Sequence, residues 1–313
     1  MNPFEPVYIE TYRRGLFDKK IRQAWDVLNS CTLCPRECGM DRLSGEKGVC
    51  QTGELAIVSS YNPHFGEERP LVGQHGSGTI FFAGCNLLCI FCQNFDISHE
   101  VEGVEWSPEV LAKAMLSLQE AGCCNINFVT PSHVVPQILA GLARAVEAGL
   151  RVPLVYNSSG YDKVETLALL EGVFDIYMPD FKFWDSKVAR GLCDAPDYPE
   201  VARSALREMH RQVGDLILND QGIAQRGVLI RHLVLPNGLA GTRGIMRFLQ
   251  REVSPKSYVN IMAQYRPSGR ASQVTSLCRR ISDKEYEGAI EVAHEEGITR
   301  LDSRKRTFMM QLF

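Results

Sequence analysis

Residues 79–94 read TIFFAGCNLLCIFCQN. The apolar run that ends at Gly84 predicts a short buried strand followed by a loop. This loop carries Cys85, Cys89 and Cys92 at Cys-x3-Cys-x2-Cys spacing. Three thiolates on one loop can hold three corners of a cubane iron–sulfur cluster, which leaves one iron without a protein ligand. An open coordination position is typical of a catalytic metal site. The alternative is a zinc site completed by a distant Cys or His.

Outward from this loop, apolar runs alternate with segments of helical periodicity. Strands are predicted at residues 79–83, 125–129, 152–156, 174–178, 228–235 and 258–262, and helices at 107–121, 134–148, 163–170, 198–213, 242–251 and 283–296. Short apolar strands that alternate with helices predict a parallel sheet buried on both faces. A doubly wound open sheet and a partial barrel both fit this α/β pattern. Either fold would gather chemistry at the carboxyl ends of the strands.

The Cys-x3-Cys-x-aromatic-Cys motif of this loop, with Phe91 as its aromatic residue, resembles the signature of radical S-adenosylmethionine (SAM) enzymes. More narrowly, the chain resembles the pyruvate formate-lyase activating enzymes and a poorly assigned activase-like branch related to them. The resemblance covers roughly residues 78–265 and implies a partial (β/α)6 TIM-like barrel. It also implies a [4Fe–4S] cluster whose open iron binds SAM. Reductive cleavage of SAM would yield a 5′-deoxyadenosyl radical that abstracts hydrogen from a substrate.

The resemblance also assigns SAM contacts to residues at the ends of later strands. It places the backbone of Phe91 near the adenine, and the segment that begins with Asn157 and Ser158 against SAM. Asp180 and Lys182, in MPDFKF, match an Asp-x-Lys that reaches the SAM carboxylate. Many family members use a carboxylate after the second strand for the SAM amino group. Here that segment offers the hydroxyl groups of Thr130 and Ser132.

A second group of cysteines lies nearer the N-terminus, in CTLCPRECGMDRLSGEKGVC. We call Cys31, Cys34, Cys38 and Cys50 the N-terminal cysteine group. Four soft ligands in a segment rich in Gly and Pro suit structural zinc or a second iron–sulfur cluster. The alternative is a set of thiols without metal. Residues 31–70 are expected to be dominated by loops.

Further polar residues fall at predicted strand ends and are candidates for substrate contact. They are His133, Tyr161, Arg231, His232, Gln264, Tyr265 and Arg266. The basic residues Arg304, Lys305 and Arg306 are expected to form a solvated tail.

Composition narrows the class of protein. The 313 residues are 45% hydrophobic and carry 34 Lys and Arg against 37 Asp and Glu, a net charge of −3. This balance does not favour a general nucleic-acid or membrane-surface binder. The N-terminus lacks the apolar core of a secretory signal, and no apolar run is long enough for a membrane helix. We therefore expect a cytoplasmic protein, in which eleven cysteines favour metal or redox chemistry over disulfides.

Three regions are predicted: a helical lead-in and Cys-rich extension at 1–75, the partial barrel at 76–270, and a C-terminal helix and tail at 271–313. The substrate of a radical SAM enzyme could be a glycyl residue of a partner protein, a small molecule or a peptide, with flavodoxin or ferredoxin as electron donor. The second functional class is a non-catalytic electron-transfer protein. Its cluster would need a fourth ligand, and the next cysteines along the chain are Cys123 and Cys124.

Overall fold

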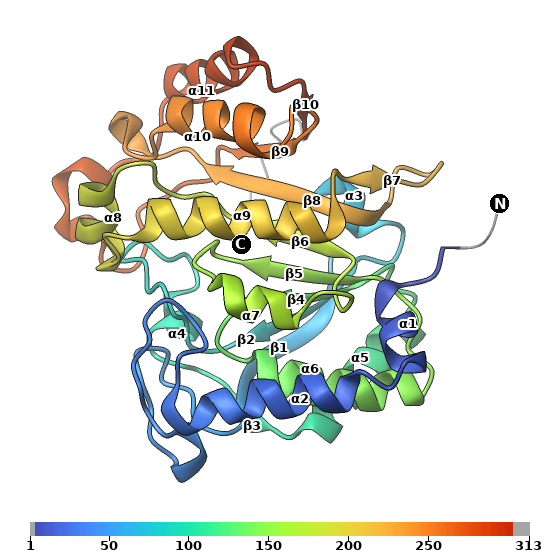
Figure 1. Ribbon diagram of the computed structural model, residues 1–313. Coiled ribbons are helices and arrows are strands. Elements are labelled where there is room, and N and C mark those ends of the chain that lie inside the picture. The colour runs from blue at the N-terminus through green and yellow to red at the C-terminus, as the bar shows by residue number, and fades with distance from the viewer. Residues whose placement is uncertain (1–3, 303–313) are drawn as a thin grey trace, which may run out of the picture.

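A computed structural model describes residues 4–302. The fold is mixed α/β and is built on one largely parallel sheet of ten strands (Figure 1). The strands follow the order β10-β9-β8-β6-β5-β4-β2-β1-β3, and β7 pairs with β8 to one side of this path. The basic residues 304–306 lie outside the described part of the chain.

The parallel part of the sheet contains all six predicted strands. They are β2 (Ser77–Phe82), β4 (Ile126–Val129), β5 (Leu154–Ser158), β6 (Ile176–Pro179), β8 (Ala224–Leu233) and β9 (Tyr258–Met262). A short seventh strand, β10 (Arg300–Leu301), pairs in parallel with β9. Because neighbouring strands run in the same direction, their carboxyl ends meet at one edge of the sheet.

Antiparallel strands complete the sheet next to β2. β1 (Ala56–His64) pairs with β2, and β3 (Val104–Trp106) pairs with β1. The expectation that residues 31–70 are dominated by loops is therefore wrong for β1. The outer half of β1 is polar and contains Pro63, so it lacks an apolar strand pattern and is held by its pairing with β2. The short β7 (Ile217–Leu218) pairs with β8.

The parallel strands are neighbours in chain order, so their right-handed crossovers place the connecting helices along one face of the sheet (Figure 1). The longer helices of the chain are α2 (Phe17–Asp26), α5 (Pro108–Glu120), α6 (Val135–Glu147), α8 (Ser186–Cys193), α9 (Tyr198–Val213) and α11 (Asp283–Glu295), and the shorter ones are α1 (Val7–Arg13), α3 (Arg69–Val72), α4 (Phe95–Ser98), α7 (Val164–Leu169) and α10 (Thr242–Phe248). α10 continues as a π-helical turn from Leu249 to Val253. Local signals set several ends: Ser282 and Glu285 form a capping box at α11, and Pro199 occupies the first turn of α9.

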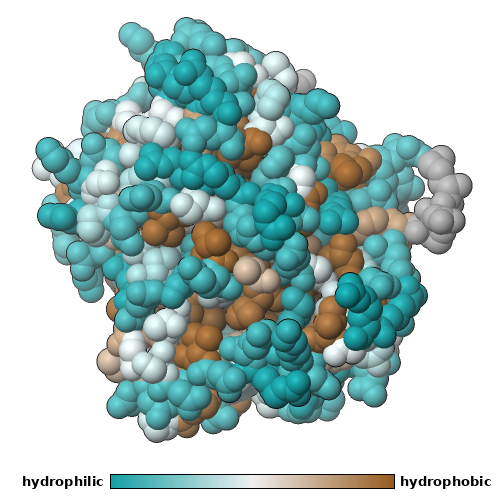
Figure 2. Space-filling view, in the orientation of Figure 1, coloured by the Kyte–Doolittle hydropathy of each residue, from teal (hydrophilic) through white to brown (hydrophobic). Residues whose placement is uncertain are grey.

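The main core lies between the sheet and these helices. Strand register aligns Ile80, Phe128, Tyr156 and Tyr177 across four neighbouring strands, and all four side chains are buried. Figure 2 shows a largely hydrophilic face over this core, with hydrophobic residues visible in its middle. Among residues 4–302, every helix is too short or too polar to cross a bilayer.

Candidate functional site

The cysteine loop, residues 84–94, leaves the carboxyl end of β2. A tight turn joins its second and third cysteines, because the Cys92 amide donates to the Cys89 carbonyl oxygen at 3.0 Å. Leu88 adopts a left-handed conformation with φ 54°, and the Leu87 amide donates to the Cys85 sulfur at 3.4 Å. The sequence-predicted cluster ligands Cys85, Cys89 and Cys92 lie close enough for their thiols to interact electrostatically.

The electrostatics of these thiols reflect burial and mutual proximity. Burial, followed by repulsion from the Cys89 thiolate, raises the pKa of Cys85 to about 12. A hydrogen bond with Cys193 and then burial raise the pKa of Cys89 well above its ordinary value. Burial also raises the pKa of Cys92. Neutral thiols are thus favoured unless a metal or a cation stabilises the thiolates.

A charged cluster of Asp180, Lys182 and Arg231 faces this loop. Lys182 Nζ pairs with Asp180 Oδ2, and Arg231 Nε donates to Asp180 Oδ1 at 2.8 Å. Arg231 Nη2 also donates to Asn157 Oδ1 at 2.7 Å. The three charged side chains are only 11%, 16% and 19% exposed. The predicted SAM contacts Asn157, Asp180 and Lys182 therefore share one network, which Arg231 completes.

The network fixes the charge states of its members. Burial disfavours the ionised form of Asp180, but the Arg231 and Lys182 cations outweigh it and lower the pKa. Burial likewise opposes the charge of Lys182, yet the Asp180 carboxylate raises its pKa. Lys182 also favours the thiolates of Cys89 and Cys92, which places its cation close to the cysteine loop.

The backbone between β5 and β6 is held in close contact with the charged cluster. Gly160 has φ 75°, and a Cβ atom there would lie 2.2 Å from the Asp180 carbonyl oxygen. The hydroxyl of Tyr198 accepts from the Lys182 amide at 2.9 Å. Only glycine fits at position 160, since both the conformation and the space exclude a side chain.

Two predicted hydroxyl contacts are engaged within the protein. Ser132 and Ser158 donate to the two oxygens of Asp162 at 2.6 and 2.5 Å, and Tyr156 donates to the same carboxylate at 3.0 Å. Burial raises the pKa of Asp162 in spite of these donors. Thr130 lies nearby with φ 59°, and its amide donates to the Asn157 carbonyl oxygen. These bonds favour a positioning role for Ser132 and Ser158.

One polar atom of this region lacks a protein partner. Among the described residues, Ser159 Oγ is buried without a hydrogen bond. It belongs to the segment after Asn157 that the sequence predicts to contact SAM. An orphaned buried hydroxyl fits a bound polar group there.

Phe91, within the cysteine loop, is buried against other aromatic side chains. Its ring is 4% exposed and meets the rings of Phe183 and Tyr265 edge-on, at centroid distances of 6.0 Å in both cases. The Tyr265 hydroxyl donates to the Leu277 carbonyl oxygen at 2.7 Å. These three aromatic rings keep water from the buried side of the loop.

The remaining substrate candidates do not gather at one cavity. His133 and His232 are buried and bond to the carbonyl oxygens of Ala83 and Phe181, and burial lowers the pKa of each imidazole to about 4. The Tyr161 hydroxyl is also engaged, with Asp197 as acceptor. These bonds favour structural roles for His133, Tyr161, His232 and Tyr265. Gln264 and Arg266 are exposed after β9.

The structure adds residues that the sequence analysis did not select. Cys193, at the end of α8, is 3% exposed and hydrogen-bonds the Cys89 thiol. The cysteine loop and α8 also share a backbone hydrogen bond, in which the Ile90 amide donates to the Leu192 carbonyl oxygen at 3.0 Å. Cys124, in contrast, bonds to the Leu71 carbonyl oxygen at the amino end of β4. The thiol nearest the cluster ligands in space is thus far from them in sequence.

Two buried carboxylates approach Arg231 from the segment before α3. Glu67 Oε2 lies 3.9 Å from Arg231 Nη1, and Asn260 donates to Glu68 Oε1 at 2.9 Å. No local motif marks Glu67 and Glu68, since only the fold brings them against β8 and β9.

The N-terminal cysteine group packs against the cysteine loop. Cys34 accepts a hydrogen bond from the side chain of Asn86, the residue after Cys85. Gly84 has φ 81°, and a Cβ atom there would lie 2.3 Å from the Cys50 carbonyl oxygen. The two cysteine groups are therefore neighbours in the fold.

Arg36 ties three segments together at this contact. Its guanidinium donates to the carbonyl oxygens of Asn86 and Leu87 in the cysteine loop, at 2.8 and 3.3 Å. It also donates to those of Cys193 and Asp194 at the end of α8, at 2.7 and 2.5 Å. This one side chain therefore joins the N-terminal segment, the cysteine loop and α8.

No three His, Cys, Asp or Glu side chains within residues 4–302 are arranged to hold one metal ion. A cubane cluster makes a different demand, because each cysteine binds a separate iron atom and the sulfur atoms need not meet at one point. The three sulfur donors of the cysteine loop, with Lys182 beside them, fit such a cluster.

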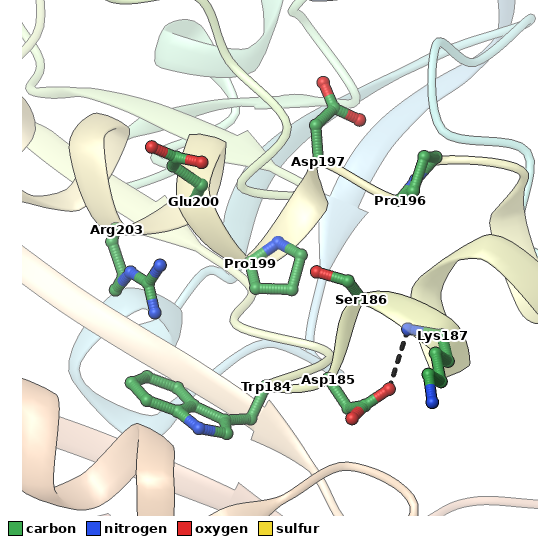
Figure 3. A pocket seen from close by; sticks show the side chains of 9 residues that line it. All are labelled: Trp184, Asp185, Ser186, Lys187, Pro196, Asp197, Pro199, Glu200 and Arg203. Carbon is green, nitrogen blue, oxygen red and sulfur yellow. Dashed lines mark hydrogen bonds between the residues drawn. The ribbon is translucent and has the colours of Figure 1, made fainter.

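A pocket of about 400 Å³ opens between α8 and α9 (Figure 3). Arg203 points toward Trp184, with its guanidinium carbon 5.0 Å from the ring centroid. None of the predicted site residues is among those that line it, which are Trp184, Asp185, Ser186, Lys187, Pro196, Asp197, Pro199, Glu200 and Arg203.

Comparison with known proteins found a sequence relative and a distant structural similarity. No protein-family model matches the chain. The "Uncharacterized protein MJ0674" of Methanocaldococcus jannaschii is 32% identical over 295 residues, covering 92% of this chain and 81% of that protein. A radical SAM methyltransferase from Sphaerobacter thermophilus has a TM-score of 0.46 and 16% identity, over 70% of this chain and 64% of its own. The chain thus spans less than two thirds of that methyltransferase, and the similarity is too low to bear on activity.

Proposed function

We propose that this chain, which belongs to the same family as the uncharacterized protein MJ0674, is a radical SAM enzyme. In this proposal Cys85, Cys89 and Cys92 hold a [4Fe–4S] cluster, and the sheet around it is a partial (β/α)6 barrel. When bound, the cluster and SAM supply a 5′-deoxyadenosyl radical that abstracts a hydrogen atom from the substrate.

The observation that supports the proposal most is the meeting of two sites from distant parts of the chain. The cysteine loop follows β2, the pair Asp180 and Lys182 follows β6, and the Lys182 cation influences both Cys89 and Cys92. A cluster with one open iron beside a fixed cation is suited to a ligand that chelates the iron and carries a carboxylate.

The residues of the chain would bind and orient this ligand. Lys182 is the point charge for the carboxylate, and Asp180 holds the lysine in place while Arg231 fixes Asp180 from the other side. Ser159 Oγ, buried and unpartnered among the described residues, is available for a hydrogen bond. Phe91 and its aromatic neighbours exclude water below the loop.

The substrate and the partners are the finer part of the proposal. The resemblance to activating enzymes favours a glycyl residue of a partner protein, and a small molecule or a peptide is the alternative. Flavodoxin or ferredoxin would supply the electron. A cytoplasmic location is part of the same proposal.

Cys193 favours a second candidate function. Because it hydrogen-bonds Cys89, it is placed to serve as the fourth cysteine ligand that an electron-transfer cluster requires. In that case the cluster would have no open iron and would not respond to SAM. Cys123 and Cys124 are poor candidates for this ligand, because Cys124 contacts Leu71 at the opposite end of the strands.

The test is a comparison of variants purified and reduced without oxygen. The wild-type chain should form 5′-deoxyadenosine from SAM, and the Cys89→Ala variant should form none. Cys278→Ala is the matched control, because Cys278 is exposed and its thiol bonds to the Thr275 carbonyl oxygen. This control should match the wild type.

Cys193→Ala separates the two candidate functions. If the chain is a radical SAM enzyme, this variant should keep its cluster and its 5′-deoxyadenosine yield. If the variant loses cluster iron, and the wild-type electron paramagnetic resonance (EPR) signal is indifferent to SAM, the electron-transfer function is correct and our proposal is wrong.

A further inference from the structure

The four cysteines of the N-terminal cysteine group lie on one segment that folds back on itself. The Gly39 amide donates to the Cys31 carbonyl oxygen at 3.0 Å, and the Cys38 sulfur approaches the same oxygen at 4.0 Å. Gly48 leaves room for the fourth thiol, since a Cβ atom there would lie 2.4 Å from the Cys38 sulfur. The segment thus presents four soft donors from a single loop.

A buried cation lies beside these thiols. Arg42 is 1% exposed, and its guanidinium donates twice to the Gly53 carbonyl oxygen, at 2.8 and 3.1 Å, and once to that of His133 at 2.9 Å. Its Nη1 atom also lies 3.9 Å from the Cys31 sulfur. Within the described chain Arg42 forms no ion pair with a carboxylate.

A buried guanidinium without an anionic partner is costly. Carbonyl oxygens satisfy its hydrogen bonds but do not balance its charge. Binding a metal centre deprotonates cysteines, and four thiolates make that centre anionic.

The spread of the thiols distinguishes between metal centres. A zinc ion needs its four sulfur atoms within about 2.3 Å of one point. No such arrangement of three or more ligands occurs among residues 4–302. A cubane distributes its cysteines over four iron atoms, so it accepts a wider spacing.

We propose that Cys31, Cys34, Cys38 and Cys50 bind a second [4Fe–4S] cluster whose negative charge is balanced by the buried guanidinium of Arg42. All four irons of this cluster have cysteine ligands, so it does not bind SAM. It lies next to the cysteine loop, because Asn86 hydrogen-bonds Cys34 and the Cys50 carbonyl contacts Gly84. The inference does not depend on the radical SAM function, since it concerns a separate set of ligands.

The test isolates each cysteine group in the full chain. One variant replaces Cys85, Cys89 and Cys92 with Ala, and the other replaces the N-terminal cysteine group with Ala. Each is reconstituted with iron and sulfide without oxygen and analysed for iron, sulfide and zinc, by Mössbauer spectroscopy and by circular dichroism. We expect about eight irons per wild-type chain and about four in each variant. Cys278→Ala, which is outside both groups, should keep the wild-type iron content.

The outcomes bear on the two proposals separately. About four irons in the Cys85/Cys89/Cys92 variant, with an EPR signal unaffected by SAM, would support the second cluster even if the wild type never cleaves SAM. Zinc in place of iron in that variant, or a folded variant without metal, would overturn it. If the N-terminal variant does not fold, the iron content of the Cys85/Cys89/Cys92 variant still decides the question.

The contribution of Arg42 is measured separately, as the reduction potential of the second cluster in the variant that lacks Cys85, Cys89 and Cys92. A neighbouring positive charge favours the reduced, more negative cluster, so Arg42→Met should shift the reduction potential to more negative values. Arg42→Lys should restore most of that shift because it keeps the charge. Equal potentials in all three proteins would show that Arg42 does not balance the cluster.

Discussion

Replacing Arg36 with Ala should destabilise the chain by about 3–4 kcal/mol. Of the four carbonyl bonds that Arg36 makes, those to Asn86, Leu87 and Cys193 are partly buried. At about 1 kcal/mol each, they contribute about 3 kcal/mol. The guanidinium also lies 5.4 Å from the ring centroid of Tyr161, which adds about 0.5–1 kcal/mol.

Thermal unfolding of the metal-free protein, followed by circular dichroism with a reductant present, measures this loss. At about 2 °C per kcal/mol for a chain of this size, Tm should fall by about 7 °C. Arg36→Lys should recover part of it, because an ammonium group cannot reach all four acceptors. Arg13→Ala is the matched control: Arg13 forms an exposed pair with Glu5, so its loss should change stability by under about 1 kcal/mol. An Arg36→Ala variant that unfolds together with this control would refute the reasoning.

Three further predictions concern single positions. Gly160→Ala should cost at least about 3 kcal/mol in a urea titration, because its Cβ meets the Asp180 carbonyl, whereas Gly191→Ala in α8 has open space and should be neutral or stabilising. Arg231→Met should cost about 3–5 kcal/mol by the same titration, since it leaves Asp180 buried with one cation fewer; a loss below about 1 kcal/mol would contradict this. Burial raises the pKa of Asp175 from 3.8 to about 7, so the folded state binds this proton more tightly and stability should fall, by up to about 4 kcal/mol, as the pH rises from about 4 to about 7. Asp175→Asn should flatten that part of the pH–stability curve, and an unchanged slope would assign it to other groups.

The parallel strands could be predicted because each is a short apolar run with turn signals at its ends. The boundaries of β9 and α9 agree with the prediction at both ends. β1 was not predicted, because its outer half is polar and is held in place by its pairing with β2. The division at residue 75 stays a prediction, and the pairing of β1 with β2 crosses it.

The candidate site was predictable where its chemistry is local. The three cysteines of one loop and the pair Asp180 and Lys182 are visible as spacing in the sequence. Cys193 and Glu67 were not, because a cysteine in an amphipathic helix and an acidic residue before a proline-containing turn are common features. The roles of Ser132 and Ser158 depend on Asp162, whose position only the folded loop after β5 reveals.

The strands at the two edges of the sheet are shorter than those in its middle. β3 has three residues and β10 has two, and within residues 4–302 neither closes the sheet by pairing with the other. An open sheet edge invites pairing with another chain, and very short edge strands are one way in which proteins prevent it. Among the described residues the sheet thus stays open at both edges without offering a long template for pairing with another chain.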